Sequence, residues 1–346
     1  MPIAFNQQLK RFFVSSPNVS LIILNWNGKT DTLECLASLE HITYENYQVI
    51  VVDNGSSDDS VTAIKESFPA AQLIETGENL GFAEGNNVGI RYAINESCDY
   101  ILLLNNDTTV APDIITEFVV AAENNQNAAL LTAKMYYHSQ PDTLWYAGAQ
   151  WDAINCVFIH RGKGENGHQQ QYNALMETDY ACGCAIFIRT KILPAIGLMD
   201  PRFFLTYEET DWCYRARALN FQILYVPKAV LWHKVSVAFG GSGSPLQSYF
   251  FMRNRLLWAE RHLGKTAYWT VLRYSLQEVF AWHNTKPSLK GLYWNTRNAL
   301  RRARKATATP QNRAKYLGLR DYIKRRFGDC PNEVRLLSSL KKDTPE

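Results

Sequence analysis

Residues Tyr100 to Asp107 read Tyr-Ile-Leu-Leu-Leu-Asn-Asn-Asp, and this stretch indicates the fold more clearly than any other. Five apolar or β-favouring residues in a row are typical of a strand buried on both faces, as in the parallel sheet of an α/β protein. Asn105, Asn106 and Asp107 then fall at the carboxyl end of the strand, the edge at which open α/β sheets bind ligands. A carboxylate there suits Mg²⁺ or Mn²⁺, which prefer oxygen ligands. For the octapeptide alone, an ordinary Asn/Asp turn is the alternative.

The preceding part of the chain alternates between strand and helix patterns. The expected strands and helices are, in chain order, 19–24, 30–39, 47–52, 60–67, 72–75 and 81–95. This order predicts a doubly wound α/β sheet. Asp53 ends the second strand much as Asp107 follows the Tyr100 strand, so two carboxylates are expected at one edge of the sheet. Together they predict a nucleotide site, with one carboxylate for the base or ribose and the other for a metal.

The block from Gly77 to Gly89 has a glycine at every fourth position. It matches neither the Gly-x-Gly-x-x-Gly of dinucleotide-binding folds nor a phosphate-binding loop that ends in Lys-Ser/Thr. We expect a helix to begin near Gly81, with small residues that let a ligand approach its amino end.

Three carboxylates lie within four residues at Glu208, Glu209 and Asp211. At helical pitch Glu208 and Asp211 share a face and Glu209 points elsewhere. Acidic residues also stabilise a helix start through the helix dipole, which is the structural alternative. The functional interpretation is a general base whose pKa is raised by crowding.

Four motifs, in this order, resemble those of glycosyltransferase family 2: Ile23 to Gly28, Val51 to Ser57, Asn79 to Gly89, and Asn105-Asn106-Asp107. The resemblance extends over about residues 18–263, and it is strongest to the rhamnosyltransferase-like branch of the family. It implies an α/β, GT-A (nucleotide-diphospho-sugar transferase) fold with a mostly parallel central sheet, flanking helices and a helical C-terminal extension. It also implies inverting transfer of a sugar from a nucleoside-diphosphate sugar, with Mg²⁺ or Mn²⁺ as the metal.

The resemblance also implies roles for single residues. Asp53 would contact the pyrimidine, and Asp107 would bind the metal, with Asn105 in place of the first aspartate of the usual Asp-x-Asp motif. Glu209 would be the base, where the family usually has aspartate, with Asp211 as second choice and Glu208 as third. The expected donor-binding residues are Asn25, Asn27, Asp53, Asn79, Gly81, Asn87, Asn105, Asn106, Gly183 and Lys234.

Two of these expectations have structural alternatives. His233 would complete the metal shell or contact the diphosphate, but a lone histidine is often a hydrogen-bonded structural residue. Gly183 would lie beside the donor diphosphate and the acceptor, but a glycine before a strand often serves close packing alone.

The composition and charge of the chain limit which classes of protein and partner remain possible. Apolar residues make up 46% of the 346 residues, and the seven cysteines are too few and too scattered for a disulfide scaffold. From Thr285 to Glu346 there are 16 Lys and Arg against 5 Asp and Glu, which suggests an anionic membrane surface or an ordinary solvated helix face. No RNA-binding signature accompanies the basic residues, so no nucleic-acid partner is expected.

We expect three regions: an N-terminal amphipathic segment at 1–17, a GT-A catalytic domain at 18–263, and a basic helical region at 264–346. No signal peptide or membrane-spanning run is recognisable, which predicts a cytoplasmic protein, peripheral on the inner face of the plasma membrane. The expected donor is dTDP-rhamnose or a UDP-sugar, and the acceptor a glycan or polyprenyl-linked glycan of a surface polysaccharide. A catalytically weak member that only binds sugar nucleotide or glycan, and a nucleotidylyltransferase, remain as alternatives.

Overall fold

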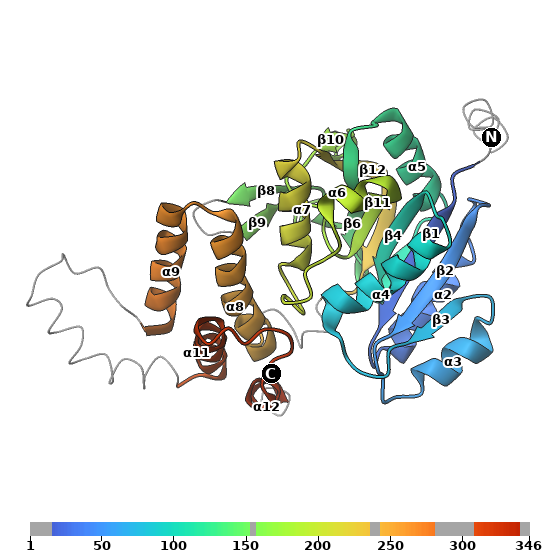
Figure 1. Ribbon diagram of the computed structural model, residues 1–346. Coiled ribbons are helices and arrows are strands. Elements are labelled where there is room, and N and C mark those ends of the chain that lie inside the picture. The colour runs from blue at the N-terminus through green and yellow to red at the C-terminus, as the bar shows by residue number, and fades with distance from the viewer. Residues whose placement is uncertain (1–15, 153–156, 236–242, 281–307, 340–346) are drawn as a thin grey trace, which may run out of the picture. The chain divides into compact units, whose positions relative to one another are not determined.

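The computed structural model describes residues 16–152, 157–235, 243–280 and 308–339 (Figure 1). The amphipathic segment expected at 1–17 lies almost wholly outside these residues. The described helices and strands of the N-terminal two thirds are, in chain order, β1 (Val19–Asn25), α2 (Lys29–Leu39), β2 (Tyr47–Asp53), α3 (Ser60–Ser67), β3 (Gln72–Glu75), α4 (Gly81–Asn95), β4 (Tyr100–Asn105), β5 (Thr108–Val110), α5 (Ile114–Asn124), β6 (Ala128–Tyr137), β7 (Gln140–Tyr146), β8 (Ala149–Asp152), β9 (Val157–His160), β10 (Met176–Glu177), β11 (Ala185–Arg189), α6 (Leu193–Ile196), α7 (Glu208–Ala218) and β12 (Gln222–His233). The helices that follow are α8 (Pro245–His262), α9 (Lys265–Phe280), α11 (Pro310–Ile323) and α12 (Asn332–Ser339).

The chain forms two compact units. The first comprises residues 1–151, 158–199 and 209–235, and the second comprises 152–157, 200–208 and 236–346. The boundary after residue 263 that the sequence suggests stays a prediction. The two compact units divide near residue 235.

A ten-stranded sheet forms the centre of the first unit, in the order β10-β12-β6-β11-β4-β1-β2-β3, with β5 on β12 and β7 on β6. Strands β4, β1, β2 and β3 pair in parallel, which confirms the alternation of strands and helices read from the sequence. Strand β11 runs antiparallel to both β4 and β6. The sheet is therefore a mixed one in which most strands share one direction, with helices flanking it (Figure 1).

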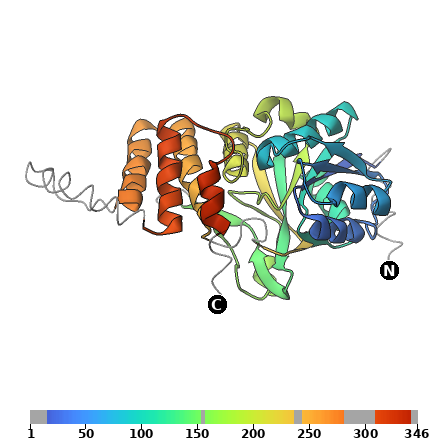
Figure 2. The ribbon, with the colours of Figure 1, turned by 90° about the horizontal axis from the view of Figure 1, so that it is seen from below.

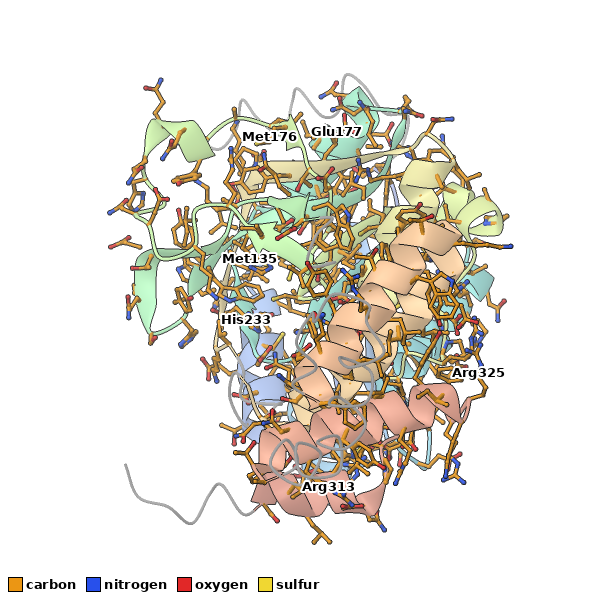
Figure 3. The ribbon with its side chains drawn as sticks, turned by 90° about the vertical axis from the view of Figure 1, so that its left-hand side faces the viewer. Met135, Met176, Glu177, His233, Arg313 and Arg325 are labelled. Atoms are coloured by element: carbon orange, nitrogen blue, oxygen red, sulfur yellow. The ribbon has the colours of Figure 1, made fainter. Side chains whose placement is uncertain are left out.

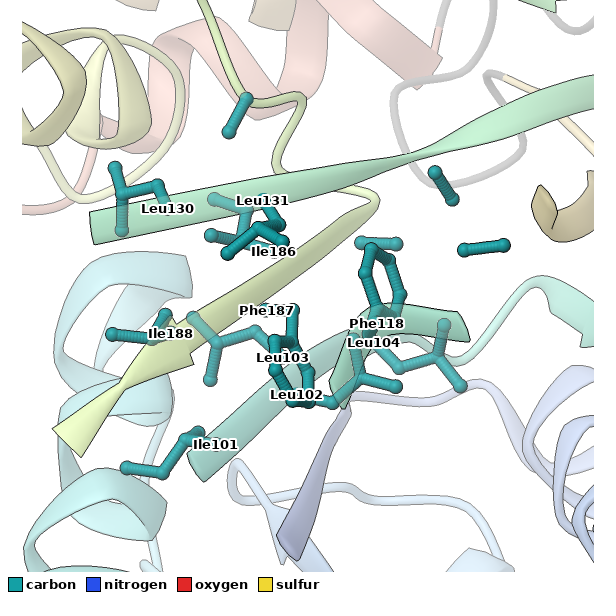
Figure 4. Close-up of a cluster of buried hydrophobic side chains, with 14 of the residues drawn as sticks. Ile101, Leu102, Leu103, Leu104, Phe118, Leu130, Leu131, Ile186, Phe187 and Ile188 are labelled. Carbon is teal, nitrogen blue, oxygen red and sulfur yellow. The ribbon is translucent and has the colours of Figure 1, made fainter. Parts of the chain in front are cut away.

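The strand that begins at Tyr100 lies at the middle of the sheet and is buried on both faces, as its apolar run predicts (Figure 4). Phe187 of β11 stacks on Tyr100 at 4.8 Å between ring centroids and on Phe118 of α5 at 5.0 Å. Offset aromatic stacks of this kind add to the free energy gained by burial. They fix the central strand, and with it the polar residues at its end.

Some element boundaries differ from the sequence-based ones. Helix α2 begins at Lys29, one residue before the expected 30–39, with Gly28 at its N-cap, and no side chain caps it. Between residues 139 and 171, β7 pairs with β6, and β8 pairs with β9 in a separate two-stranded sheet. Strand β12 is 12 residues long, and His233 is its last residue.

The second unit contains the C-terminal helices, which confirms the helical character expected there (Figure 2). Ser244 and Thr309 cap α8 and α11, each followed by a proline that suits the first helical turn. Its small core gathers apolar side chains from α8, α11 and α12 and from the loops before α7 and α12, namely Phe204, Tyr249, Phe250, Ala314, Leu317, Cys330 and Val334. Among the described residues, none of the helices is long and apolar enough to cross a membrane.

Within this unit, two neighbouring polar residues of α8 hold the segment 200–206. Arg253 is fully buried and donates to the carbonyl of Phe203 at 2.9 Å, and Asn254 donates to those of Phe203, Leu205 and Thr206 at 2.8 Å each. Phe204 and Thr206 have φ angles of 64° and 66°, which are uncommon for residues with a side chain. The hydrogen bonds from α8 thus fix an unusual backbone path that leads into α7.

Candidate active site

Parallel pairing brings the ends of three strands to one edge of the sheet. Asn25, the last residue of β1, lies beside Asp53, the last residue of β2. Leu24 lies beside Asn105, the last residue of β4. The polar side chains that end these strands therefore gather at the carboxyl edge, where α/β sheets bind ligands.

Hydrogen bonds connect the side chains at this edge and fix the orientation of Asp53. Its Oδ1 accepts from Asn25 Nδ2 at 2.7 Å, and its Oδ2 accepts from the backbone N–H of Ser56 at 3.0 Å. Asn25 accepts from Thr32 Oγ1 at 2.8 Å, and Thr32 accepts from Asn106 Nδ2 at 2.9 Å. Each oxygen of Asp53 keeps a second lone pair for a donor group on a ligand.

The other asparagines expected to bind the donor have partners within the protein. Asn27 has a φ of 52°, and its Oδ1 accepts from a backbone N–H of the loop after β2 at 2.7 Å. Asn79 Oδ1 accepts from the N–H of Gly81 at 2.9 Å. Asn87 binds the main chain of Met199 twice, donating to its carbonyl at 2.9 Å and accepting from its N–H at 3.1 Å. They therefore shape the loops at this edge, and a direct contact with the donor stays a prediction.

Asp107 and His233 meet although they are far apart in the sequence. Strand β12 pairs with β5 so that His233 lies opposite Thr108, and the backbone N–H of Lys234 donates to the carbonyl of Asp107 at 3.0 Å. His233 Nε2 then lies 3.2 Å from Asp107 Oδ1 (His233 is labelled in Figure 3). Both side chains are buried, and Trp145 packs edge-on against the imidazole, with the two ring centroids 4.5 Å apart.

The Asp107–His233 pair fits a divalent cation. Asp107 Oδ1 and His233 Nε2 lie 3.2 Å apart without forming a hydrogen bond, and Oδ1 is buried with no hydrogen-bond partner among the described residues. Two adjacent ligands of an octahedral ion at the usual Mg²⁺–oxygen distance lie about 3 Å apart, close to the separation seen here. In the described part of the chain, no group of three His, Cys, Asp or Glu could hold a metal ion. A metal bound by this pair therefore needs further oxygen ligands from a substrate or water.

Lys234 is engaged by two acidic residues of α2. Its Nζ lies 2.6 Å from Asp31 Oδ1 and 2.7 Å from Glu34 Oε2. Burial alone would lower the pKa of Lys234, but these two carboxylates hold it above its ordinary value. The charge of Lys234 is thus balanced within the protein, and its expected phosphate contact stays a prediction.

The three carboxylates on α7 have different surroundings. Asp211 is fully buried and forms an ion pair with Arg215 Nε at 2.8 Å, and Arg215 also donates to the carbonyl of Leu198 at 2.8 Å. Glu208 is buried at the first position of the helix. Asp211 is therefore occupied by an ion pair that fixes the helix.

Glu209 has one carboxylate oxygen bound and the other free to react. Tyr180 donates its hydroxyl to Oε1 at 2.6 Å, whereas Oε2 is buried and has no hydrogen-bond partner among the described residues. Burial raises the pKa of Glu209, and the hydrogen bond from Tyr180 opposes that rise. Gly183 lies close by, since a Cβ added to it would stand 3.5 Å from Oε1. Of the three carboxylates, Glu209 is best suited to accept a proton.

Within the first unit, a chain of neighbouring residues links Asp53, Asp107 and Glu209. Asn106 and Asp107 are joined in it as consecutive residues, and the other links are hydrogen bonds, an ion pair and ring contacts. The chain runs through Asp53, Asn25, Thr32, Asn106, Asp107, His233, Trp145, His160, Tyr180 and Glu209. Trp145 and His160 meet edge-on at 5.2 Å, and His160 and Tyr180 lie 6.4 Å apart. The expected nucleotide, metal and base residues therefore belong to one network of neighbours.

Sequence reasoning did not identify Thr32, Trp145, His160 or Tyr180 as parts of this network. Thr32 lies in a helix whose only sequence signal is its apolar spacing, and Trp145 and His160 lie in a segment without a recognisable motif. Tyr180 lies beside the small residues that precede β11, a pattern that carries no information about a partner on α7.

The chain belongs to glycosyl transferase family 2, whose family model matches residues 20–193, about half of the chain. It is 24% identical over 252 residues to the dTDP-rhamnosyl transferase RfbF of Shigella flexneri, covering 69% of this chain and 79% of the relative. It is also 24% identical over 291 residues to an N-acetylglucosaminyl-diphospho-decaprenol L-rhamnosyltransferase of Mycobacterium tuberculosis, covering 78% of this chain and 90% of the relative.

Among solved structures, the fold is similar to that of a mannosyltransferase from Pyrobaculum calidifontis in complex with GDP-Man and Mn²⁺. The TM-score is 0.52 at 14% identity, and the match covers 94% of each chain. The protein thus has the GT-A fold that the sequence motifs imply, and it is a member of a glycosyltransferase family.

The different surroundings of Asp211 and Glu209 predict opposite effects on stability. Asp211→Asn should lower the free energy of unfolding by about 3 kcal/mol, because Arg215 then loses its buried partner. Glu209→Gln should leave it unchanged or raise it at pH 7. The pKa of Glu209 is raised in the folded wild type, so the wild type loses stability as the pH rises from the ordinary glutamate pKa to that raised value. Glutamine does not titrate, so the variant has no such loss.

Urea denaturation of both variants at pH 5 and pH 7 measures the difference. An equal loss of stability in the two variants would contradict the distinction between an ion-paired Asp211 and a buried, reactive Glu209.

Proposed function

We propose that this protein is a metal-dependent inverting glycosyltransferase that moves a hexose, rhamnose or a related sugar, from a nucleoside-diphosphate sugar to a glycan or lipid-linked glycan. The observation that carries the proposal is the chain of neighbouring residues from Asp53 through the Asp107–His233 pair to Glu209. It offers a nucleotide contact, a cation site and a candidate base in one network. Membership of glycosyl transferase family 2 supports the class of reaction.

The base step follows from the chemistry of inverting transfer. The acceptor hydroxyl attacks the anomeric carbon from the face opposite the leaving group and loses its proton as the new bond forms. Glu209 Oε2 takes that proton, and the electron pair of the broken bond goes to the nucleoside diphosphate. Positioned general bases typically contribute about 10²–10⁴-fold to a rate.

Asp107 and His233 would hold Mg²⁺ or Mn²⁺, and a bound ion stabilises negative charge on the departing diphosphate. Asp53, fixed by Asn25, would accept a hydrogen bond from a pyrimidine base. The mannosyltransferase of similar fold was solved with a nucleoside-diphosphate sugar and Mn²⁺, which is consistent with these roles.

The relatives narrow the substrates that we propose. One is a dTDP-rhamnosyl transferase, which supports dTDP-rhamnose as the first donor to try, with UDP-sugars as the second. The mycobacterial relative is named for a sugar-diphospho-decaprenol, which supports a polyprenyl-linked glycan as the acceptor. Family membership speaks against a nucleotidylyltransferase. A member that binds sugar nucleotides without transferring them is distinguished by the next experiment.

The direct test incubates the purified full chain with Mn²⁺, a short polyprenyl-diphosphate sugar and a panel of dTDP-, UDP- and GDP-sugars. We expect release of the nucleoside diphosphate with one donor class.

Asp107→Ala should remove Mn²⁺-dependent donor binding, measured by calorimetry, because it deletes one of two cation ligands. Glu209→Gln should bind the donor normally and turn over at least about a hundredfold more slowly.

Asp142→Ala is the matched control, because Asp142 also contacts a histidine, His168 Nε2 at 2.8 Å, but at an exposed position. Donor binding that survives Asp107→Ala as well as it survives Asp142→Ala would contradict the metal role. Retained donor binding with no turnover in the wild type would instead support a non-catalytic binder.

We also propose that the protein works at the inner face of the plasma membrane, held by the basic residues that precede α11. Three cations on and just after α11 are balanced within the second unit: Arg313 by Glu333, Lys315 by Glu278 and Arg325 by Glu260, at 2.6–2.7 Å each (Arg313 and Arg325 are labelled in Figure 3). These residues therefore have less charge to offer to lipids. The proposal rests on the run from Arg297 to Lys305, which lies outside the described residues.

Replacing Arg301, Arg302, Arg304 and Lys305 by glutamine should release the protein from anionic liposomes in a flotation assay, because each basic residue near such a surface contributes about 1 kcal/mol. Replacing Arg313, Lys315 and Arg325 in the same way serves as the comparison and should have a smaller effect. Unchanged flotation of the first variant would refute the membrane proposal.

A further inference from the structure

We propose that Tyr180 is a positioning residue for the base: it holds Oε1 of Glu209 and thereby assigns the proton-accepting role to Oε2. This inference rests on the proposed function, because it concerns the residue to which that function gives the proton. It adds a residue that the sequence motifs did not identify as part of the site.

The geometry of the pair supports a fixed division of the two oxygens. The Tyr180 hydroxyl donates to Oε1 at 2.6 Å, which is short for an O–H···O hydrogen bond and in the range of bonds to a charged acceptor. Oε2 is buried and has no hydrogen-bond partner among the described residues. Burying a carboxylate oxygen without a hydrogen-bond partner lowers the stability of the folded protein. We therefore expect the substrate to supply the donor group that Oε2 lacks.

The phenol ring of Tyr180 is held from several sides. Phe158 of β9 stacks on it with ring centroids 4.4 Å apart and a 20° interplanar angle. Tyr146 of β7 packs at 69° to it and donates its hydroxyl to the carbonyl of Tyr180. The ring is buried, so its hydroxyl has little freedom to leave Glu209.

The main chain beside Tyr180 is also tied to the helix that carries the base. The backbone N–H of Ala181 donates to Cys213 Sγ at 3.3 Å, and Cys213 lies four residues after Glu209. Residues four apart share one face of a helix, so α7 contacts this segment through both positions. The distance between phenol and carboxylate is thus set by two attachments, not by a single hydrogen bond.

The hydrogen bond favours the ionised carboxylate, whereas burial favours the protonated one. Burial, with the charge of Glu209 adding to it, raises the pKa of Tyr180 well above its ordinary value, so the phenol stays a proton donor throughout the working range. The net result is a carboxylate whose pKa is raised but which still loses its proton to become a base.

Other groups around Glu209 add little charge that varies with pH. Burial lowers the pKa of His160 to about 4 and raises that of Cys213 to about 12, and burial likewise raises the pKa of Cys182, so all three are neutral near pH 7. On α7 itself, the charge of Asp211 is paired with Arg215. Glu208 is the remaining carboxylate beside Glu209 and is unchanged in the variants below.

The test is Tyr180→Phe in the full chain, which keeps the ring and removes the hydroxyl. We expect the acidic limb of the pH profile of kcat/KM for nucleoside-diphosphate release, at saturating Mn²⁺, to move up by about one pH unit. Loss of a hydrogen bond to a charged group accounts for a change of that size. Tyr225→Phe is the matched control, because Tyr225 is also buried and donates to the carbonyl of Tyr172 at 2.9 Å, so the acidic limb of this variant should not move.

A second measurement does not require turnover. In protein labelled with ¹³C at the glutamate carboxyl, the signal missing from Glu209→Gln identifies Glu209, and its titration gives the pKa directly. Tyr180→Phe should raise that pKa by about one, and an unchanged pKa would overturn the inference even if activity falls. A raised pKa with no turnover on any donor would refute the proposed function and leave the pairing of Tyr180 with Glu209 intact, so the two failures are distinguishable.

Discussion

In-register pairing at the carboxyl edge of the sheet is the constraint on which the rest of the site depends. The parallel ladder places Asn25 beside Asp53, and the pairing of β5 with β12 places His233 beside Asp107. A slip of one residue in either ladder would turn these side chains to the opposite face of the sheet. In the first ladder, Ile22 and Ile23 of β1 and Val51 and Val52 of β2 are fully buried in the core, so their close packing opposes such a slip.

The site separates two kinds of carboxylate by their surroundings. Asp53 and Asp211 are buried with partners that hold their charge in place, Asn25 and Ser56 for one and Arg215 for the other. Asp107 Oδ1, though 3.2 Å from His233 Nε2, and Glu209 Oε2 are both buried without a hydrogen bond among the described residues. Unpaired buried oxygens are unfavourable in an isolated protein, so they indicate where a cation or a substrate hydroxyl would contribute the missing interaction.

The sequence predicted the fold well because its signals are local. The apolar runs of β1, β2 and β4 and the glycine at the start of α4 specify the elements directly, and four ordered motifs specify the family. The antiparallel insertion of β11 between β4 and β6 could not be read in this way, because pairing order is a tertiary property. The same limit applies to the site: Glu209 was singled out by its motif, whereas Tyr180, 29 residues earlier, becomes its partner only through folding.

The most direct measurement of the central claim is pulsed EPR of Mn²⁺ bound to the full chain with UDP or dTDP. If the Asp107–His233 pair and the diphosphate share one ion, the spectrum should contain both ³¹P coupling from the nucleotide and ¹⁴N coupling from an imidazole. His233→Gln should remove the nitrogen coupling and keep the phosphorus coupling. A wild-type spectrum with ³¹P coupling but without ¹⁴N coupling would contradict the claim that these residues form the metal site.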